Sequence, residues 1–417
     1  MECRIAYGRQ VLTLTVPDER LVGTLAPRPC RRVADVAAAV RQSLRRPLQS
    51  PPLEALVRGR RSALIVTVDN TRPSPAPLIG PVLDVLGAHG VRATVINATG
   101  RHRQMTPDEL AAHFGPRIMG SCHVLQHDPF DARQMVRKGT TKRGTAIRIN
   151  REVFRHDLVI GCGFIEPSYL CGWSGGRKLL MPGLAHYEAI DSNHYHLTEA
   201  GAVIGRLHGN PVSDDAAEFA AALPMHFIVY AVAGPNDEVV RVVSGHAVAA
   251  HERACRACER IYRIPAREAD IVISSAGGWP YDFDLVQAKK AIIPASEAVR
   301  PNGAIILAGA CPDGLGAEPT FLRWLKTKTP AEVVRDVRDR RQFNLGAHGA
   351  NILARPIVEK NAKVILVTNP DVAAQLRGTY VTAVTRLQDA WRLANLITGP
   401  GATVLVIEKA RRLILSH

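Results

Sequence analysis

Residues 63–97 read ALIVTVDNTRPSPAPLIGPVLDVLGAHGVRATVIN, and this stretch decides the fold class. A β-rich run at 63–68 leads through a turn-rich segment into a helical pattern at 78–86, and a second strand pattern follows at 92–97. Parallel strands need a long crossover connection, usually a helix, so this alternation is typical of a βαβ unit. With the next helix predicted to start near Thr106, the stretch predicts an α/β fold.

Similar patterns continue to the end of the chain. We predict further strands at 158–161, 227–232, 270–274, 304–308, 363–368 and 403–407. The segment IPARE near 264–268 separates a long helical pattern from a new strand and marks a domain boundary. We expect two α/β domains with mainly parallel sheets flanked by helices, at residues 1–265 and 266–417, with the active site in the cleft between them. Near the N-terminus, the alternation at 11–16 and the turn PDER predict a hairpin.

The composition indicates a soluble globular protein. The 417 residues are 46% hydrophobic and 22% charged, which suits two or three domains and excludes a disordered or collagenous chain. The nearest candidate for a membrane span, 219–234, contains Pro224 and His226 and is too short to cross a bilayer. The first residues lack the apolar run of an export signal, so we expect a cytoplasmic protein.

The net charge of +15 points to an anionic ligand. The densest basic clusters, at 28–32, 58–61 and 335–341, lack interleaved aromatic residues, and aromatic residues make up only 5% of the chain. This pattern favours a small anionic molecule over a nucleic acid.

The eight cysteines follow no disulfide framework, which is typical of free thiols in a reducing compartment. Cys255 and Cys258 form a CxxC within a helical pattern. No second pair lies nearby, so we expect two thiols on a helix face rather than a zinc or redox site.

Two loops after predicted strands carry candidate site residues. In DNTRPSP at 69–75, Thr71 or Ser74 can cap the following helix. Arg72 in the same loop can bind a carboxylate through two hydrogen bonds, and a surface arginine is the alternative. In the next loop, ATGRHR, the flanking arginines favour the neutral form of His102, which a general base needs; a structural histidine is the alternative.

The string GFIEPSYLCGWSGGRK ends at Lys178. Its Ser-Gly-Gly loop, Ser174 to Gly176, can present backbone N–H groups to a phosphate, and Lys178 can add charge or a covalent amine. Sixteen residues further on, His194 and His196 would share a face if they lay on a strand, which would suit a metal. One buried and one exposed imidazole is the alternative.

A last pair follows the predicted strand at 270–274. Gln287 and Lys290 stand three residues apart on the helix predicted over 284–291. On one helix face they could hold an anion together, and a solvated face is the alternative.

Taken together, these strings resemble the lactate racemase family, whose members use a tethered nickel pincer nucleotide. The resemblance is carried by TRPSP, TGRHRQMT, GFIEP followed by SGGRK and MPG, the NH pair that ends at His194, and GGWPYDFDLVQAKK. Five ordered motifs with consistent spacing are more specific than any single one.

The resemblance implies a role for each matching residue. Lys178 is expected to form a thioamide bond to the cofactor, pyridinium-3-thioamide-5-thiocarboxylic acid mononucleotide, and His194 to complete its square-planar Ni(II). Arg72 and Lys290 are expected to hold the substrate carboxylate, with Gln287 beside the substrate and His102 as one of two catalytic histidines. Further expected cofactor-binding residues are Asp69, Thr71, Ser174, Gly175 and Gly176. The partners implied are the proteins that make this cofactor and insert its nickel.

One position departs from the family pattern. The second catalytic histidine of the family lies ten residues before the lysine, and this chain has Ser168 there. Serine does not act as a base at neutral pH unless another group activates it. The groups that could replace the histidine are Tyr169, His186, His196 or a hydroxyl of the substrate.

We therefore expect an isomerase, a racemase or epimerase of an α-hydroxy acid that works by reversible hydride transfer. The substrate expected from Ser168 is a small anion larger or more polar than lactate, such as a sugar acid. Two alternatives are one-sided oxidoreductase chemistry and a noncatalytic binding protein that keeps Lys178 and His194. A nucleic-acid binder would leave the ordered motifs unexplained.

Overall fold

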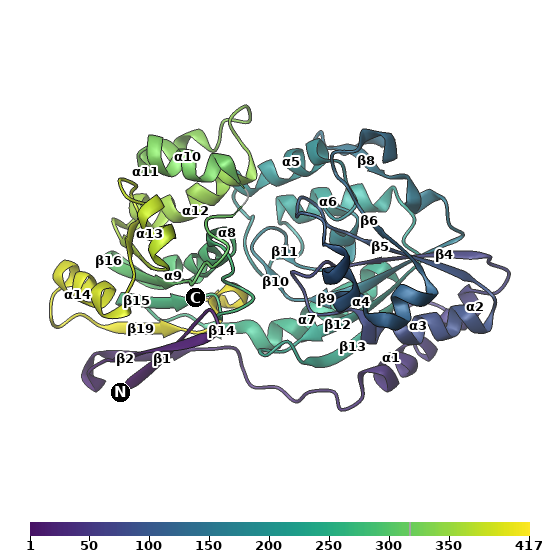
Figure 1. The fold of residues 1–417 in the computed structure, drawn as a ribbon, viewed down its shortest axis with the longest axis horizontal. Helices are drawn as coiled ribbons and strands as arrows, with labels where there is room; N and C mark the ends of the chain where they lie inside the picture. The colour runs from purple at the N-terminus through teal and green to yellow at the C-terminus, as the bar shows by residue number, and fades with distance from the viewer. Residues whose placement is uncertain (317) are drawn as a thin grey trace. The chain divides into compact units, whose positions relative to one another are not determined.

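The computed structural model describes residues 1–316 and 318–417, which divide into two compact units. The central unit comprises residues 29–261, and the terminal unit combines residues 1–28 with residues 262–417. Each unit contains a six-stranded sheet with helices packed on it (Figure 1). The prediction of two α/β domains with mainly parallel sheets is confirmed.

The sheet of the central unit has the strand order β13-β12-β9-β4-β5-β6. Its strands are β4 (Ser62–Thr67), β5 (Arg92–Asn97), β6 (His123–Gln126), β9 (Leu158–Ile165), β12 (Phe227–Ala233) and β13 (Val239–Gly245). All neighbours are parallel except β12 and β13. Every residue of β9 is buried, as expected for a central strand of a parallel sheet with both faces covered.

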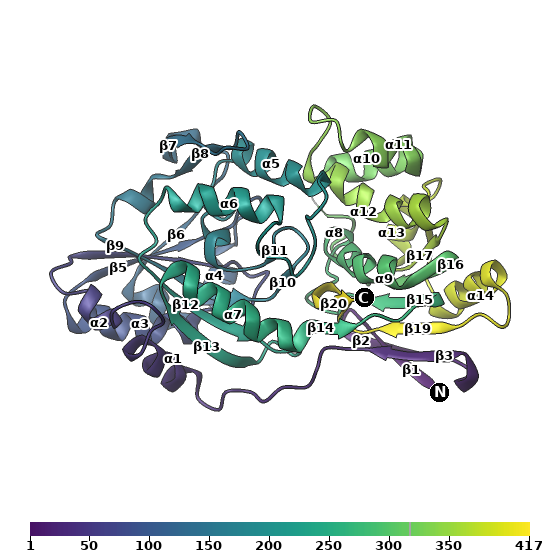
Figure 2. The same ribbon diagram turned by 180° about the vertical axis from the view of Figure 1, so that it is seen from behind.

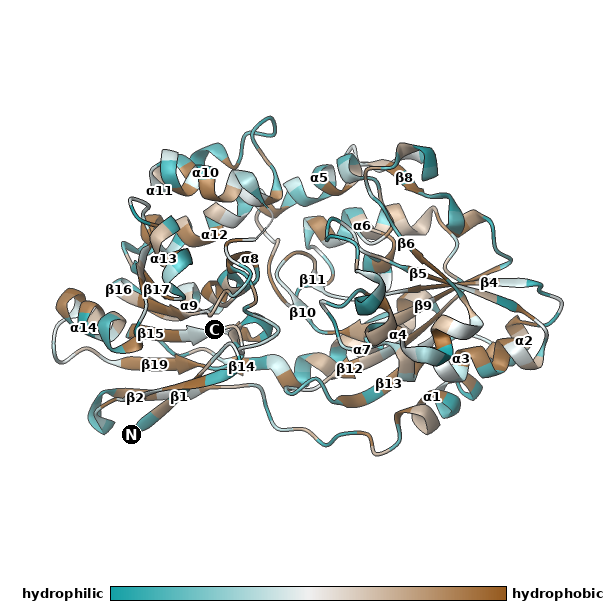
Figure 3. Ribbon diagram, in the orientation of Figure 1, coloured by the Kyte–Doolittle hydropathy of each residue, from teal (hydrophilic) through white to brown (hydrophobic). Residues whose placement is uncertain are grey.

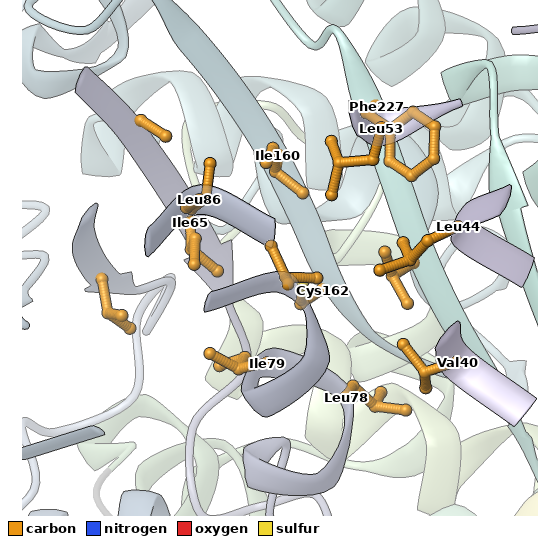
Figure 4. Close-up of a cluster of buried hydrophobic side chains, with 14 of the residues drawn as sticks. Val40, Leu44, Leu53, Ile65, Leu78, Ile79, Leu86, Ile160, Cys162 and Phe227 are labelled. Carbon is orange, nitrogen blue, oxygen red and sulfur yellow. The ribbon is translucent and has the colours of Figure 1, made fainter. Parts of the chain in front are cut away.

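Helices cover both faces of this sheet. The helices of the unit are α1 (Val36–Arg45), α2 (Leu53–Leu56), α3 (Ala76–Ala88), α4 (Pro107–Ser121), α5 (Tyr187–Tyr195), α6 (Pro211–Ala221) and α7 (Ala247–Tyr262). The side chains of α1 and α3 pack with Ile65, Ile160 and Cys162 of the strands in one apolar cluster (Figure 4). Helices α6 and α7 cover the other face of the sheet, and they are in front in Figure 2, which shows the molecule from behind.

The second face of β9 carries glycines because a loop lies directly on it. Side chains alternate along a strand, so Ile160 and Cys162 point into the apolar cluster while Gly161 and Gly163 face the other way. A Cβ on Gly161 would lie 3.1 Å from Cδ1 of Leu179, the last residue of a short 3-10 helix at Gly176–Leu179. Because of this close approach, the SGGRK loop packs directly against the sheet.

The sheet of the terminal unit is parallel throughout, with the order β18-β17-β16-β15-β19-β3. Its strands are β3 (Leu21–Leu25), β15 (Ala269–Ser275), β16 (Val299–Ala308), β17 (Lys363–Val367), β18 (Thr382–Val384) and β19 (Val404–Ile407). Its helices are α8 (Leu285–Ala288), α9 (Ile292–Ala298), α10 (Pro319–Thr327), α11 (Pro330–Asp336), α12 (Leu345–Lys360), α13 (Pro370–Gln375) and α14 (Leu387–Thr398). Both chain termini lie in this unit.

Short two-stranded sheets complete the two units. They pair β1 (Glu2–Tyr7) with β2 (Gln10–Thr15), β7 (Met135–Thr140) with β8 (Ala146–Asn150), β10 (Pro167–Ser168) with β11 (Gly172–Trp173), and β14 (Arg263–Pro265) with β20 (Ile414–Ser416).

Apolar residues concentrate on the strands of both sheets and polar residues on the outer helix faces (Figure 3). In the described part of the chain, no helix combines the length and the apolar character needed to cross a membrane.

The first residues of the chain correct the expected domain division. Strand β3 pairs in parallel with β19, and Val16 is fully buried in the core of the terminal unit beside Ile271 and Val406. Residues 1–28 therefore do not belong with the central residues in one domain spanning 1–265. The boundary expected between residues 265 and 266 falls instead between Ile261 and Tyr262. Local patterns do not show that a strand pairs with a partner nearly 400 residues away.

The N-terminal hairpin turns earlier than predicted. Strands β1 and β2 pair from Glu2 opposite Thr15 to Tyr7 opposite Gln10, so the turn lies at Gly8 and Arg9. Gly8 has φ +52°, a conformation that glycine adopts without strain. The expected turn residues PDER instead lead into β3 through a 3-10 helix at Asp18–Arg20.

We expect the Val16→Ala substitution to lower the free energy of unfolding by about 2 kcal/mol, because it removes buried methyl groups from the core of the terminal unit. Val11→Ala is the matched control, because Val11 in the same hairpin is 49% exposed. Chemical denaturation measures both values. Equal stability of the two variants would contradict the placement of residues 1–28 in this core.

Candidate functional site

Three neighbouring strands of the central sheet, β5, β4 and β9, end at the same edge. Thr67 of β4 lies opposite Asn97 of β5 and Cys162 of β9. The loops that leave these strands contain the motifs DNTRPSP, ATGRHR and EPSYLCGWSGGRK. Open α/β sheets bind their ligands beyond the carboxyl ends of the strands, so the fold brings the predicted motifs to the expected edge.

His102 and Asp69 form a hydrogen-bonded pair. The Nδ1 atom of His102 lies 2.6 Å from Oδ2 of Asp69, and both the hydroxyl and the backbone N–H of Thr71 donate to Oδ1. Burial by itself raises the pKa of the Asp69 carboxyl, but His102, Thr71 and Arg72 outweigh it and hold that pKa well below its usual value. A carboxylate at Nδ1 keeps a proton there, so Nε2 is the nitrogen that can accept one. His102 is 49% exposed and accessible to a ligand.

The surroundings of His102 differ from the predicted ones. Arg101 forms an ion pair with Asp191, and Arg103 forms one with Glu109 at 2.5 Å. Both guanidinium groups are therefore neutralised by their own partners, and a carboxylate faces the His102 ring. The charged group that contacts the His102 ring is the Asp69 carboxylate, whereas both flanking arginines have carboxylate partners elsewhere.

Arg72 is held by a buried acid that sequence reasoning did not single out. Its Nε lies 2.7 Å from Oε1 of Glu166, which is only 3% exposed, and its Nη1 donates to the backbone carbonyl of Thr71 at 2.9 Å. Glu166 belongs to the quoted string GFIEP, where an acid directly after a wholly apolar strand was the available signal. Neither Thr71 nor Ser74 is the N-cap of α3, which starts at Ala76 after Pro75.

Ser174 stabilises the loop that follows β9 through two hydrogen bonds. Its hydroxyl donates to the carbonyl of Phe164 at 3.0 Å and accepts the backbone N–H of Glu166 at 2.9 Å. Gly175 and Gly176 then adopt φ values of +73° and +55°. A Cβ on Gly176 would lie 2.6 Å from Cγ of His251, so the backbone at this loop admits no side chain.

The amine of Lys178 lies in the protein interior. Burial lowers the pKa of this amine and Arg72 adds to the lowering, while the opposing effects of Cys171, Glu166 and Asp69 do not offset it. Its Nζ donates to Oγ of Ser168 at 3.3 Å. An amine whose neutral form is favoured is a better nucleophile than a surface lysine, so this environment suits covalent attachment.

His194 lies in the last turn of α5 and His196 in the 3-10 turn that follows, so the strand on which they would have shared a face is not formed. Both imidazoles are buried, so the alternative of one buried and one exposed ring is wrong. The His194 ring is buried, and its Nδ1 is 3.1 Å from Oδ1 of Asn193. The amide of Asn193 in turn donates to Asp215 at 2.8 Å. A hydrogen bond of this kind at Nδ1 leaves Nε2 as the nitrogen that would bind a metal. His196 instead pairs with Glu199.

No group of three or more His, Cys, Asp or Glu side chains in the described residues is arranged to hold a metal ion. A metal at His194 would therefore need donor atoms from a bound molecule. Cys255 and Cys258 are buried free thiols on α7, as the helix-face interpretation predicted.

Gln287 and Lys290 lie together in the terminal unit. Gln287 belongs to α8, which Asp284 caps by accepting the Gln287 backbone N–H at 2.7 Å. Lys290 follows in a 3-10 turn, and its Nζ donates to Oε1 of Gln287. The two side chains share one side of the turn, as the three-residue spacing predicted.

Two family models together match most of the chain. Residues 7–205 match the lactate racemase N-terminal domain, and residues 264–414 match the lactate racemase C-terminal domain. The chain belongs to the lactate racemase family. This confirms the resemblance seen in the ordered motifs.

Individual family members are similar along the whole chain. The lactate racemase of Thermoanaerobacterium thermosaccharolyticum is 32% identical over 97% of this chain and 96% of its own length, and that of Lactiplantibacillus plantarum is 29% identical over 97% of both. The structure of the T. thermosaccharolyticum lactate racemase apoprotein covers 100% of both chains with a TM-score of 0.92 at 30% identity. A crystal structure of a Thermotoga maritima protein, 18% identical with a TM-score of 0.68, shares the fold.

We expect Asp69→Asn to change how stability depends on pH. Because the pKa of Asp69 is lower in the folded than in the unfolded protein, its carboxylate stabilises the fold above about pH 4, and this contribution is lost as the pH falls further. The gap in unfolding free energy between wild type and Asp69→Asn should therefore narrow from pH 7 to pH 3. Denaturant titrations measure it, with Asp84→Asn at a half-exposed carboxylate as the control. A gap independent of pH would contradict the assigned pairing.

Proposed function

We propose that this chain is an α-hydroxy-acid racemase or epimerase that binds a nickel pincer nucleotide and acts on a substrate other than lactate. The observation that carries the proposal is the Lys178 amine, which is buried beside Ser168 and next to a loop of two glycines with positive φ. In a member of the lactate racemase family, an amine in this state is suited to a covalent cofactor.

The residues of the central unit fit such a group. Lys178 would form the thioamide bond, and His194 would offer Nε2 to the nickel, whose other donors would come from the nucleotide. Backbone N–H groups around Gly175 and Gly176, where no side chain intrudes, could cradle its phosphate. When bound, the cofactor supplies a reversible hydride acceptor. Asp69, Thr71 and Ser174 would shape the same site through the hydrogen bonds described above.

In this proposal, His102 moves the proton of the substrate. Its Nε2 takes the proton of the C2 hydroxyl, and the Asp69 carboxylate on Nδ1 stabilises the imidazolium that results. Arg72 holds the substrate carboxylate through the guanidinium nitrogens that Glu166 does not bind, and Glu166 acts as a positioning residue. Return of hydrogen to the other face of C2 gives the opposite configuration.

We also propose that Gln287 and Lys290 bind the substrate, as the resemblance to the family implies. Lys290 carries the positive charge that a second contact to a carboxylate requires, and Gln287 holds its Nζ through Oε1. The net charge of +15 favours the approach of anions.

Ser168 decides the proposed substrate class. A serine is shorter than a histidine and is not a base at neutral pH, so the position leaves more room and removes one proton carrier. The Ser168 hydroxyl already accepts a hydrogen bond from Lys178 at 3.3 Å, and the Cys171 thiol lies 4.0 Å from it. A longer hydroxy acid, such as a sugar acid, could fill the room and bring its own hydroxyl.

We expect wild-type protein that is co-expressed with the proteins that make the cofactor and insert nickel to show a covalent mass adduct and bound nickel. Lys178→Ala should lose both, because no other buried amine lies in this loop. Intact-mass spectrometry and nickel analysis measure the result, with Lys142→Ala, an exposed lysine, as the control. Absence of an adduct under conditions that load a known family member would favour a noncatalytic binding protein.

We expect loaded enzyme to convert hydroxylated C4 to C6 2-hydroxy acids at least tenfold faster than lactate, which corresponds to about 1.4 kcal/mol at the transition state. Chiral chromatography measures the interconversion of configurations. Equal rates on lactate and the longer acids would contradict the substrate class inferred from Ser168. Accumulation of a 2-oxo acid without inversion would instead identify one-sided oxidoreductase chemistry.

A further inference from the structure

Arg177, the residue before Lys178, is a partly buried cation with one unsatisfied guanidinium nitrogen among the described residues. Its Nη2 is fully covered and has no hydrogen-bond partner among the described residues. Burial lowers the pKa of the guanidinium, and the acids nearest to it do not offset this effect.

Two acids lie near Arg177 but do not neutralise it. Asp214 in the first turn of α6 and Glu252 on α7 act on it only through their charge, without a hydrogen bond to it. Glu252 is already shared, with His208 at 3.1 Å and Arg256 at 3.8 Å. The guanidinium therefore retains the capacity to bind an anion.

Arg177 lines a cavity of about 210 Å³ within the central unit. The walls are mainly apolar side chains of α6, α7 and the segment before β12, including Ala217, Ala220, Leu223, Met225 and Val248. The first residues of α7, a helix of 16 residues, also line it, and the backbone at a helix N-terminus favours negative charge. Arg177 and the N-terminus of α7 thus each favour an anion in a cavity whose walls are mainly apolar.

The polar groups of the cavity besides Arg177 are His246, His251 and Glu252. Burial lowers the pKa of His251 to about 4, so its ring is neutral at pH 7, and its Nε2 donates to the carbonyl of Ser174 at 2.9 Å. Arg177 is the cationic group among these residues, so the anionic end of a ligand is expected at its guanidinium rather than at the Glu252 carboxylate.

The volume limits the ligand to a small molecule. A cavity of about 150 Å³ accepts benzene, so this one has room for about six to nine non-hydrogen atoms. A nucleotide is several times larger and does not fit. A bare phosphate would leave the apolar walls uncovered.

We propose that this cavity binds a small carboxylate with an apolar body, with the carboxylate on Arg177 and the body against the alanines of α6. An occupant would contact Gly176 and Arg177, which directly precede Lys178, and His251, which packs on Gly176. It would thus stabilise the loop that carries Lys178 without entering the proposed active site. The proposal does not depend on the nickel nucleotide.

Isothermal titration calorimetry of the full chain with benzoate tests the proposal. We expect Arg177→Met to weaken benzoate binding at least tenfold, because a charged hydrogen bond is lost. Arg253→Met, at an exposed arginine of the same helix α7, should leave the affinity unchanged. Benzyl alcohol, which has the same body without the charge, should bind at least tenfold more weakly than benzoate.

A second variant keeps the test independent of the stability of Arg177→Met. Ala220→Leu fills the apolar end of the cavity and leaves Arg177 in place, so it should also weaken benzoate binding. Arg72→Met should retain that binding, because Arg72 belongs to the proposed active site.

Four outcomes would overturn the proposal. They are no benzoate binding to wild type, benzoate binding that survives Arg177→Met and Ala220→Leu, binding that disappears only in Arg72→Met, and Arg177-dependent binding of inorganic phosphate but not of benzoate. The third would place the carboxylate in the proposed active site and leave the proposed function standing.

Discussion

The parallel pairing of β4 with β5 on one side and β9 on the other is the constraint on which the candidate site depends. It makes three loops leave one edge of the sheet, so Asp69, His102 and Glu166 approach each other although they lie up to 97 residues apart. The candidate site depends equally on the pairing register of β9. A slip by one residue would turn Gly161 and Gly163 into the apolar cluster and remove the flat surface on which the SGGRK loop rests.

The charged groups of the site form pairs around the amine of Lys178. Asp69 faces His102 and Glu166 faces Arg72, so each buried carboxylate has a cationic or basic partner and meets the requirement that buried charges be compensated. Lys178 has only the neutral hydroxyl of Ser168 as its hydrogen-bond acceptor in the described structure. Its lowered pKa follows from this asymmetry, since burial disfavours the ammonium form and no carboxylate contacts it directly.

Ser168 separates what the family shares from what this chain does differently. The fold superposes on the lactate racemase apoprotein with a TM-score of 0.92, so the scaffold around this position is retained. The resemblance to the family implies a histidine at this position, so we propose that Ser168 changes both the space and the proton-transfer groups beside Lys178. In the proposed mechanism, His102 is the one histidine base, and such a site is chemically suited to a substrate that contributes polar groups of its own.

The sequence by itself determined the α/β class, most strands, the carboxyl-edge location of the motifs and the family. These depend on local periodicity and on motifs contiguous in the chain, such as the run before Asp69 and the string ending at Lys178. Only the tertiary structure decided that residues 1–28 join the terminal unit, that Glu166 holds Arg72, and that Asp69 rather than the flanking arginines faces His102. It also placed His194 on a helix and left Arg177 beside an apolar cavity. The physical reason is the same in each case: strand pairing, ion pairs and burial are set by contacts between distant segments, which local sequence patterns do not encode.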